Sequence, residues 1–489
     1  SLKVVGKKIL VANGKGFSSL ANPKMSQPVF KNDDVGMHVG PDKKLRVQYI
    51  GSLFKGTLSI IETPDNNKLM EYSRKVYQNM PLDKHKAATL KIPSDNPVPT
   101  TPGKRSPIKY VFYVIKENRT YDQVFGDIAK GNGDTSLCIF PEKITPNQHA
   151  LANEFVLLDN FYVDAEVSAD GHNWSMAAYA TDFVEKIWPT QYGKRGETEF
   201  VGARKIAHPK DGYIWDYCNR AGISYRTYGE FVSGAKKTTP NEAYLTSLAG
   251  HFCPDFIPFD QDIRDFERFE AWKRDFDSLL TINQVPQFNT LRMGEDHTSG
   301  QKLGAFTPIA AVASNDLAVG LLIEHISKSP IWKESAIFIL EDDAQNGPDH
   351  VDAHRSTALV ISPYTKRREV VSTMYSTSGM LRTMELILGL PPMSQYDAAA
   401  LPMYDCFMTV PDTSSFTHLA PGTDIFKKNM VGNKSSEKSK KFNLRKEDSV
   451  PDDLLNEVIW KSVKGENAKV PAPRRSAFVK LREGDKDDD

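Results

Sequence analysis

Acidic and amide side chains that could bind a metal ion follow two apolar runs of the chain. Glu117 and Asn118 come one residue after the run YVFYVI. Asp342 and Asp343 come one residue after the run AIFIL. Carboxylates that converge in this way repel one another and have raised pKa values unless a cation neutralises them, so the pattern predicts a divalent metal site. The alternative is that each acidic residue caps a helix or pairs with a Lys or Arg side chain.

Two histidines follow the second acidic pair. The segment EDDAQNGPDHVDAHRS places His350 and His354 among four aspartates. On a helix, residues four apart share a face and could bind one metal ion, although Pro348 favours a loop up to Asp349. The alternative is a solvated acidic loop with two ordinary histidines.

Ser168 is the candidate nucleophile. It lies in FYVDAEVSADGHNWSMAAYATD, which follows a predicted strand and enters a predicted helix, with Gly171 allowing a tight turn before the helix begins. Backbone N–H groups at a helix N-terminus favour a phosphate there. Ser175 is the competing serine, and Ser168 itself could instead be a helix N-cap. His172 could orient or protonate reacting groups, or serve as a capping or core residue.

A third polar segment, LRMGEDHTSG, places Asp296 and His297 in a turn flanked by glycines. The two side chains could contribute to a second metal ion. They could equally belong to a surface turn.

These residues need a scaffold of alternating strands and helices. Apolar runs at 110–115, 154–161, 223–229, 336–340 and 358–362 predict buried strands. Helical periodicity appears in ATDFVEK, IAAVASNDLAVGLLIEHI and SGMLRTMELIL. The alternation predicts an α/β fold with a mostly parallel sheet covered by helices on both faces. Ligands bind beyond the carboxyl ends of the strands in such sheets, which is where the acidic pairs lie.

The chain is expected to divide into four parts. Residues 1–90 carry short β segments, KKILVAN and GTLSIIE, with nothing helical evident, and residues 91–107 form a Pro-rich linker. The main domain spans 108–430, in which the aromatic-rich stretch 185–275 is either a cap or ordinary core. The tail, 431–489, combines a flexible NKSSEKSKK, a short docking helix in DLLNEVIWKSV and a disordered GDKDDD.

Composition excludes some partners and leaves others open. Lys and Arg together number 62, as do Asp and Glu, so the net charge favours neither nucleic acid nor an anionic membrane surface. No run approaches the ~20 apolar residues of a transmembrane segment, and the start has no signal-peptide core. The four cysteines lack metal-knuckle spacing and are expected to be buried thiols: Cys138, Cys218, Cys253 and Cys406. The oligomeric state is not predicted.

Three motifs resemble a known family. VIKENRTYDQVFG resembles the E-N-x-[ST]-[FY]-D-x-x-FG opening of the phosphoesterase family that includes bacterial phospholipases C and a related acid phosphatase. DDAQNGPDHV is similar to that family's D-E-x-G-G-x-x-DHV segment. SADGH resembles the S-x-x-G-H of cofactor-independent phosphoglycerate mutases, which belong to the same alkaline-phosphatase superfamily. The matches extend over roughly residues 108–420, and their order makes the joint signal strong.

The resemblance implies an alkaline-phosphatase-like three-layer αβα sandwich and a role for each matched residue. Glu117 and Asn118 take the place of the first metal-binding pair, and Ser168 that of the metal-bound nucleophile. Asp342 and Asp343 take the place of the acidic metal-binding pair.

A second metal is also implied. Asp296, next to His297, corresponds to an acidic ligand of that metal, and His350 or His354 to a late histidine ligand. Asp343 stands where phospholipase C relatives commonly have glutamate. The number of divalent ions, one or two, and their identity among zinc, calcium, magnesium and manganese stay open.

The implied activity is metal-dependent hydrolysis of phosphate esters through a serine nucleophile. The substrate would be a small phosphate ester or a phospholipid headgroup. The alternatives are a mutase-like phosphotransferase and a non-catalytic binding protein. The first ninety residues resemble the last blade of a YVTN-type β-propeller, an arrangement familiar in exported bacterial proteins, which implies a periplasmic or secreted location.

Overall fold

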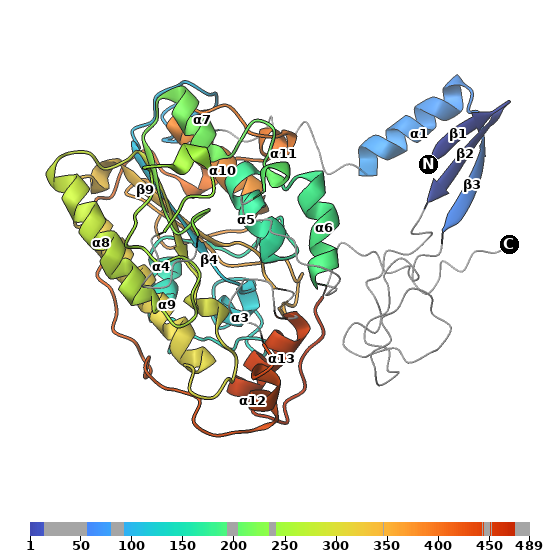
Figure 1. The fold of residues 1–489 in the computed structure, drawn as a ribbon. Helices are drawn as coiled ribbons and strands as arrows, with labels where there is room; N and C mark the ends of the chain where they lie inside the picture. Colours follow the sequence, from blue (N-terminus) through green and yellow to red (C-terminus); the bar gives the residue numbers. More distant parts are fainter. Residues whose placement is uncertain are drawn as a thin grey trace. The chain divides into compact units, whose positions relative to one another are not determined.

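The computed structural model describes residues 1–13, 56–79, 92–192, 204–233, 241–345, 347–442, 444, 450 and 452–474. The chain divides into two compact units, the first comprising residues 1–91 with 475–489 and the second residues 92–474. All of the predicted site residues belong to the second unit, whose labelled elements run from β4 to α13 in Figure 1.

The described residues of the small unit form an antiparallel sheet and one helix. Its sheet has the order β1-β2-β3, formed by β1 (Leu2–Val5), β2 (Lys8–Asn13) and β3 (Thr57–Glu62), and α1 (Asn66–Asn79) follows. The two predicted β segments are confirmed, but the expectation of nothing helical was wrong. Asp65 accepts a hydrogen bond from the backbone of Lys68 at the start of α1, and Leu69 and Val76 lie two turns apart on one helix face. The relation to a propeller blade stays a prediction.

The large unit is built on a five-stranded sheet of order β10-β9-β4-β8-β7. The strands are β4 (Tyr110–Lys116), β7 (Tyr225–Tyr228), β8 (Phe288–Met293), β9 (Ser335–Glu341) and β10 (Ala358–Ile361). All neighbouring pairs are parallel except β10 with β9, so the predicted mostly parallel sheet is confirmed. The sequence did not predict β8, because Asn289, Thr290 and Arg292 interrupt its apolar pattern.

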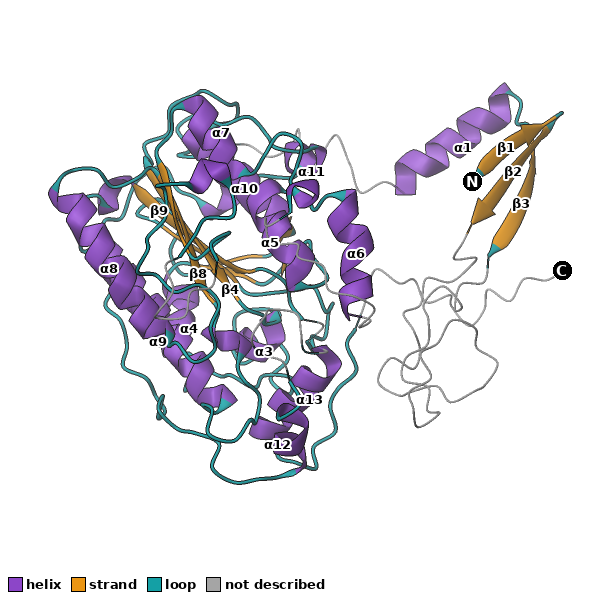
Figure 2. Cartoon of the chain, viewed as in Figure 1, coloured by secondary structure: helices purple, strands orange, loops and turns teal. Residues whose placement is uncertain are grey.

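Helices cover both faces of this sheet, as Figure 2 shows. Side chains alternate along β4, so Val111 and Tyr113 face one layer and Phe112 and Val114 the other. The first layer comprises α5 (Ser168–Ala177), α7 (Ile214–Ala221) and α10 (Thr377–Leu388). The second comprises α3 (Tyr121–Phe125), α4 (Pro146–Glu154), α8 (Asp265–Thr281) and α9 (Pro308–Ser327). The architecture is therefore the expected three-layer αβα sandwich.

Shorter elements complete the unit. Two small parallel ladders pair β5 (Val156–Leu158) with β11 (Glu369–Val371) and β6 (Phe161–Tyr162) with β12 (Tyr375–Ser376). Two further helices of the unit are α6 (Asp182–Tyr192) and α11 (Gln395–Ala399). The run 154–161 therefore forms strands outside the central sheet. Within 185–275, Trp215 and Trp272 are buried in the two core layers and β7 joins the sheet, so this stretch supplies core.

The carboxyl-terminal part packs onto the sandwich through α12 (Lys434–Ser439) and α13 (Asp452–Lys464). The prediction of a flexible NKSSEKSKK was wrong, because Asn433 caps α12 by accepting a hydrogen bond from the backbone of Ser436 at 2.6 Å. Ile459 and Trp460 of α13 pack against Val312 of α9. The GDKDDD end lies outside the described residues.

Burial also explains the state of the four cysteines and the apolar character of α9. The four cysteines are free and buried, as predicted. α9 is long and apolar enough to cross a membrane, but 72% of its apolar window is buried inside the unit, which is typical of a core helix. Pro-rich residues ahead of β4 are partly buried as well, with Val98 exposing only 1% of its surface.

Candidate active site

Four of the predicted residues meet beyond the carboxyl ends of β4 and β9. The Asn118 amide nitrogen donates hydrogen bonds to Ser168 Oγ at 3.0 Å, Asp342 Oδ1 at 3.2 Å and Asp343 Oδ2 at 2.6 Å. The Ser168 hydroxyl donates to Asp343 Oδ2 at 2.8 Å. All four side chains are buried. The structure therefore joins residues that are more than 200 positions apart in the chain, as strand-end placement predicted.

Ser168 is the first residue of α5, and not part of the connection before it. Val167 occupies the N-cap position, and the Ser168 hydroxyl is directed at Asp343. Gly171 also lies within the helix. A Cβ atom at Gly171 would be 2.8 Å from the carbonyl oxygen of Asp342, so glycine allows α5 to approach the end of β9. Ser175, the competing serine, is fully buried two turns farther along α5.

Glu117 lies beside this cluster and is held by an arginine that the sequence did not single out. Arg292, on β8, donates to Glu117 Oε1 from Nε at 2.8 Å and from Nη2 at 2.5 Å. Arg292 Nη2 is also 2.8 Å from Nε2 of His172. That same imidazole nitrogen is 3.5 Å from Asp342 Oδ2. The predicted His172 thus reaches the site from one helical turn after Ser168.

The two aspartates carry the electrostatic signature of a cation site. Burial, the neighbouring Asp343 carboxylate and Glu117 raise the pKa of Asp342 well above its usual range. Burial raises the pKa of Asp343 to about 6, although the hydrogen bond from Ser168 opposes the rise. Such an excess of buried negative charge is relieved when a cation binds among the carboxylates.

The donor atoms fit a divalent metal ion. Asn118 Oδ1 and Asp342 Oδ2 are buried acceptors that receive no hydrogen bond from any described residue. A half-turn of the Asn118 amide exchanges its oxygen and nitrogen, so the residue can offer an oxygen ligand. Oxygen ligands of this kind suit hard divalent cations. Glu117, Asn118, Asp342 and Asp343 would hold the ion.

Asp296 has a different environment from the one predicted. It lies in a short 3-10 turn, η4 (Glu295–His297), and its Oδ1 accepts a hydrogen bond from the backbone of Glu117 at 3.1 Å. The ammonium group of Lys116 is 2.9 Å from Asp296 Oδ2 and 2.7 Å from Glu341 Oε1. Burial alone would lower the pKa of Lys116, but the two carboxylates raise it, so the ammonium stays charged. A cation from the protein thus already neutralises Asp296.

His297 is buried beside Asp296. Its ring lies edge-on to Phe259 at 5.6 Å between centroids, and its Nδ1 is 3.2 Å from the carbonyl oxygen of Thr298. Burial lowers the pKa of His297 to about 4, so the imidazole is neutral at physiological pH. A neutral imidazole is able to bind a metal ion, and that role of His297 stays a prediction.

The two late histidines pair with other carboxylates, in a loop and not on a helix. Nδ1 of His350 is 2.7 Å from Asp122 Oδ2. His354 contacts Asp352 through Nδ1 at 2.7 Å and Glu166 through Nε2 at 3.2 Å. The structure therefore does not bring His350 and His354 onto one face, and their predicted role as metal ligands stays a prediction.

The motif residues around His350 form a network centred on an arginine. Asp122, Asp349 and His350 could together hold a metal ion by the proximity of their ligand atoms. However, the guanidinium of Arg355 is 3.0 Å from Asp122 Oδ1 and 3.0 Å from Asp349 Oδ1, and both carboxylates are buried. Because Arg355 already supplies a positive charge between them, the group is better explained as a structural ion-pair network.

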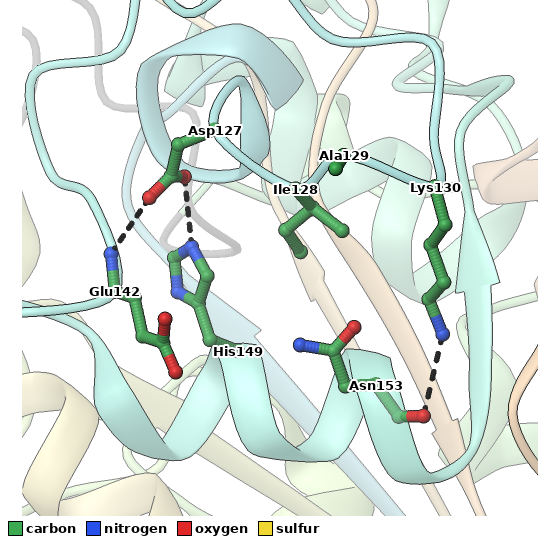
Figure 3. Close-up of a pocket in the computed structure, with 7 residues that line it drawn as sticks. All are labelled: Asp127, Ile128, Ala129, Lys130, Glu142, His149 and Asn153. Carbon is green, nitrogen blue, oxygen red and sulfur yellow. Dashed lines mark hydrogen bonds and ion pairs between the residues drawn. The ribbon is translucent and has the colours of Figure 1, made fainter.

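A separate pocket of about 330 Å³ lies near the start of α4 (Figure 3). Its lining consists of Asp127, Ile128, Ala129, Lys130, Glu142, His149 and Asn153. His149 Nε2 is 2.9 Å from Asp127 Oδ1, and the Lys130 ammonium donates to the Asn153 carbonyl at 3.3 Å. His149, Asp127 and Lys130 are thus partnered, and none of the predicted site residues lines the pocket.

Comparison with known proteins adds to this geometry. No curated protein matches the chain. Among solved structures, a protein of the alkaline phosphatase superfamily from Vibrio parahaemolyticus aligns with a TM-score of 0.42 and 15% identity, covering 63% of this chain and 73% of that one. The lipoteichoic acid synthase LtaP from Listeria monocytogenes aligns with a TM-score of 0.40 and 12% identity, covering 79% and 98%. The model of the Phosphoesterase family matches residues 128–391, more than half of the sequence, and the chain therefore belongs to that family.

Proposed function

We propose that the chain hydrolyses phosphate esters, with Ser168 as the nucleophile. The observation that carries the proposal is the hydrogen bond from the Ser168 hydroxyl to Asp343 at 2.8 Å, at the first residue of α5. A helix N-terminus favours a phosphate group through its N–H groups and its dipole. The proton acceptor Asp343, the nucleophile Ser168 and the N–H groups at the start of α5 thus lie together.

In the first step, the Ser168 oxygen forms a bond to phosphorus while Asp343 accepts the hydroxyl proton. The bond between phosphorus and the leaving oxygen breaks, and the departing alkoxide takes up a proton from the solvent to leave as an alcohol. In the second step, a water oxygen bonds to phosphorus and releases a proton to the solvent. The serine–phosphorus bond breaks and Asp343 returns its proton to the Ser168 oxygen, which releases phosphate and restores the hydroxyl. A divalent ion held by Glu117, Asn118, Asp342 and Asp343 would lower the pKa of the Ser168 hydroxyl and offset charge on the phosphoryl oxygens.

Asn118 has a positioning part in this scheme. Before an ion binds, three contacts from its amide nitrogen hold Ser168 relative to Asp342 and Asp343. With the amide turned, its oxygen would hold the same geometry through the shared ion. The substrate class that we propose is a small phosphate ester or a phospholipid headgroup, and it rests on the motif resemblance. An exported location rests on that resemblance as well.

The test compares wild type with Ser168→Ala on p-nitrophenyl phosphate and bis(p-nitrophenyl) phosphate. We expect Ser168→Ala to lower kcat by about three orders of magnitude or more. Ser175→Ala, a buried serine of the same helix, is the matched control and should keep most activity.

The wild type should lose activity in a chelator and regain it with zinc, calcium, magnesium or manganese added singly. Full activity in Ser168→Ala would refute the serine nucleophile, and the ratio of the two rates separates monoesterase from diesterase.

A further inference from the structure

A buried carboxylate lies at Nδ1 of His172, while Arg292 and Asp342 lie at the other ring nitrogen, Nε2. Glu230 follows β7 and exposes none of its surface. Its Oε2 is 3.2 Å from Nδ1 of His172, which is also fully buried. Among the described residues, neither Glu230 oxygen nor His172 Nδ1 has a conventional hydrogen-bond partner, so the 3.2 Å contact between them is electrostatic. Burying an ionised carboxylate is costly unless a partner compensates, and His172 is that partner.

The turn that carries Glu230 is closely constrained. The Thr227 hydroxyl donates to the Glu230 carbonyl at 3.0 Å. Gly229 has φ of +94°, and a Cβ atom there would be 2.9 Å from the ring of Phe256. Glycine at this position therefore allows the backbone to turn and place the Glu230 side chain inward.

The donors and acceptors around His172 form a directed chain. A guanidinium has no acceptor atom, so Arg292 Nη2, at 2.8 Å, must donate to His172 Nε2. In the neutral imidazole, the single ring proton then lies on Nδ1, the nitrogen that is 3.2 Å from Glu230 Oε2. Arg292 in turn donates to Glu117 Oε1 through both Nε and Nη2. Each link thus fixes the orientation of the next.

We propose that Glu230 is a positioning residue, which acts through His172 and Arg292 to hold Glu117 at the candidate metal site. Glu230 sets the tautomer and the ring plane of His172, so that Nε2 accepts from Arg292. Arg292 then keeps Glu117 beside Asp342. This assignment rests on the proposed function, and it makes His172 a positioning residue as well. Partners of this kind behind metal ligands affect metal affinity or activity by about 10- to 100-fold when removed.

The test is a double-mutant cycle of Glu230→Ala and His172→Ala, read as the affinity for manganese and as kcat and KM on an aryl phosphate. We expect each single variant to weaken manganese binding and lower kcat by about 10- to 100-fold. The double variant should match either single one, because the two residues act as one unit. Glu230→Gln should retain most of the affinity, since its amide oxygen can still accept from Nδ1.

Nitrogen NMR of histidine-labelled protein gives an independent readout. The wild type should show the ring proton of His172 on Nδ1, and Glu230→Ala should lose that signature. Asp316→Ala is the control for a general loss of stability. Asp316 is another fully buried acid, on α9, and it accepts hydrogen bonds from the backbone of Asn147 and Gln148 on α4. This variant should change the melting temperature without changing manganese affinity.

Two outcomes would overturn the proposal: additive losses in the cycle, or unchanged manganese affinity in Glu230→Ala. A wild type that binds manganese but does not hydrolyse phosphate esters would instead refute the proposed function. The binding cycle and the NMR signature would still test the Glu230 assignment in that case.

Discussion

The ammonium group of Lys116 lies 2.9 Å from Asp296 Oδ2, and each side chain exposes no more than 2% of its surface. Lys116 ends β4, one residue before Glu117, and also pairs with Glu341 at the end of β9. Thr357 completes the surroundings by donating to Glu341 Oε1 at 3.0 Å. The position predicted to bind a second metal ion through Asp296 therefore carries a cation of its own.

We predict that the wild-type chain binds a single equivalent of divalent metal. A second ion at Asp296 would lie against the Lys116 ammonium and be repelled by it. Replacing Lys116 with Met removes the ammonium that pairs with the two buried carboxylates, which should lower the free energy of unfolding by about 3–5 kcal/mol in chelator. Added divalent metal should restore part of that stability in Lys116→Met, and metal analysis of the dialysed protein should then give more than one equivalent.

Lys109→Met provides the control for this experiment. Lys109 pairs with Glu334 at 2.8 Å, but its side chain is 60% exposed, so its loss should change stability little. Two equivalents of metal in the wild type would contradict the prediction.

Gly171→Ala tests the close approach of α5 to β9. The added methyl group would lie 2.8 Å from the Asp342 carbonyl oxygen, inside van der Waals contact, so the helix must move away from Asp342. We expect a loss of about 1–3 kcal/mol in the free energy of unfolding. Because Ser168 is on the same helix, we also expect a fall in kcat of about tenfold or more on an aryl phosphate.

Gly379→Ala separates these two effects. A methyl group at Gly379 in α10 would lie 2.8 Å from the Leu401 carbonyl oxygen, which is the same kind of clash in another helix. This variant should be destabilised to a similar extent with little change in kcat. Equal kcat in both variants would mean that the contact between Gly171 and Asp342 does not position Ser168.

The parts of the site that could be predicted from sequence are those that follow continuous apolar strands. YVFYVI and AIFIL are buried on both sides, so their ends, and hence Asn118 and Asp343, were recognisable. β8 carries Arg292 among polar residues. Because this strand was not predicted, no position at the site could be predicted for Arg292. Ser168 was predicted from its motif and its position before a helix, but its contact with Asp343 needs the fold.

Contacts between distant residues explain what could not be predicted. Lys116 meets Asp296, and Glu230 meets His172, only because the sheet order places their strands and loops together. The spacing of His350 and His354 suggested one helix face, but the glycine and proline of that segment keep it irregular. Each histidine then pairs with the nearest carboxylate. No local pattern marks such pairings, since they depend on residues contributed by separate elements.

Arg355→Met tests whether the network of Asp122 and Asp349 is structural. Removing the guanidinium leaves buried Asp349 without its ion-pair partner and buried Asp122 with only His350, so we expect a loss of about 3–5 kcal/mol in the free energy of unfolding, measured by urea denaturation. The loss of stability caused by Arg355→Met should be the same with and without chelator. Lys186→Met, which removes an exposed ion pair with Asp182, is the control and should change stability little. A smaller loss in Arg355→Met than in the control would contradict the structural role.

His354 makes the stability depend on pH in the alkaline range. Burial alone would lower the pKa of His354, but Asp352 and Glu166 raise it to about 9. Because the folded pKa exceeds the ordinary value of about 6.5, the stabilisation is fully present below pH 6.5 and is lost as the pH rises through 9. The difference in free energy of unfolding between wild type and His354→Gln should therefore shrink from pH 6 to pH 9.5 on urea denaturation. NMR titration of His354 should give the raised pKa directly, and Glu166→Gln should lower it. A difference that stays constant over this range would show that His354 does not form these ion pairs in solution.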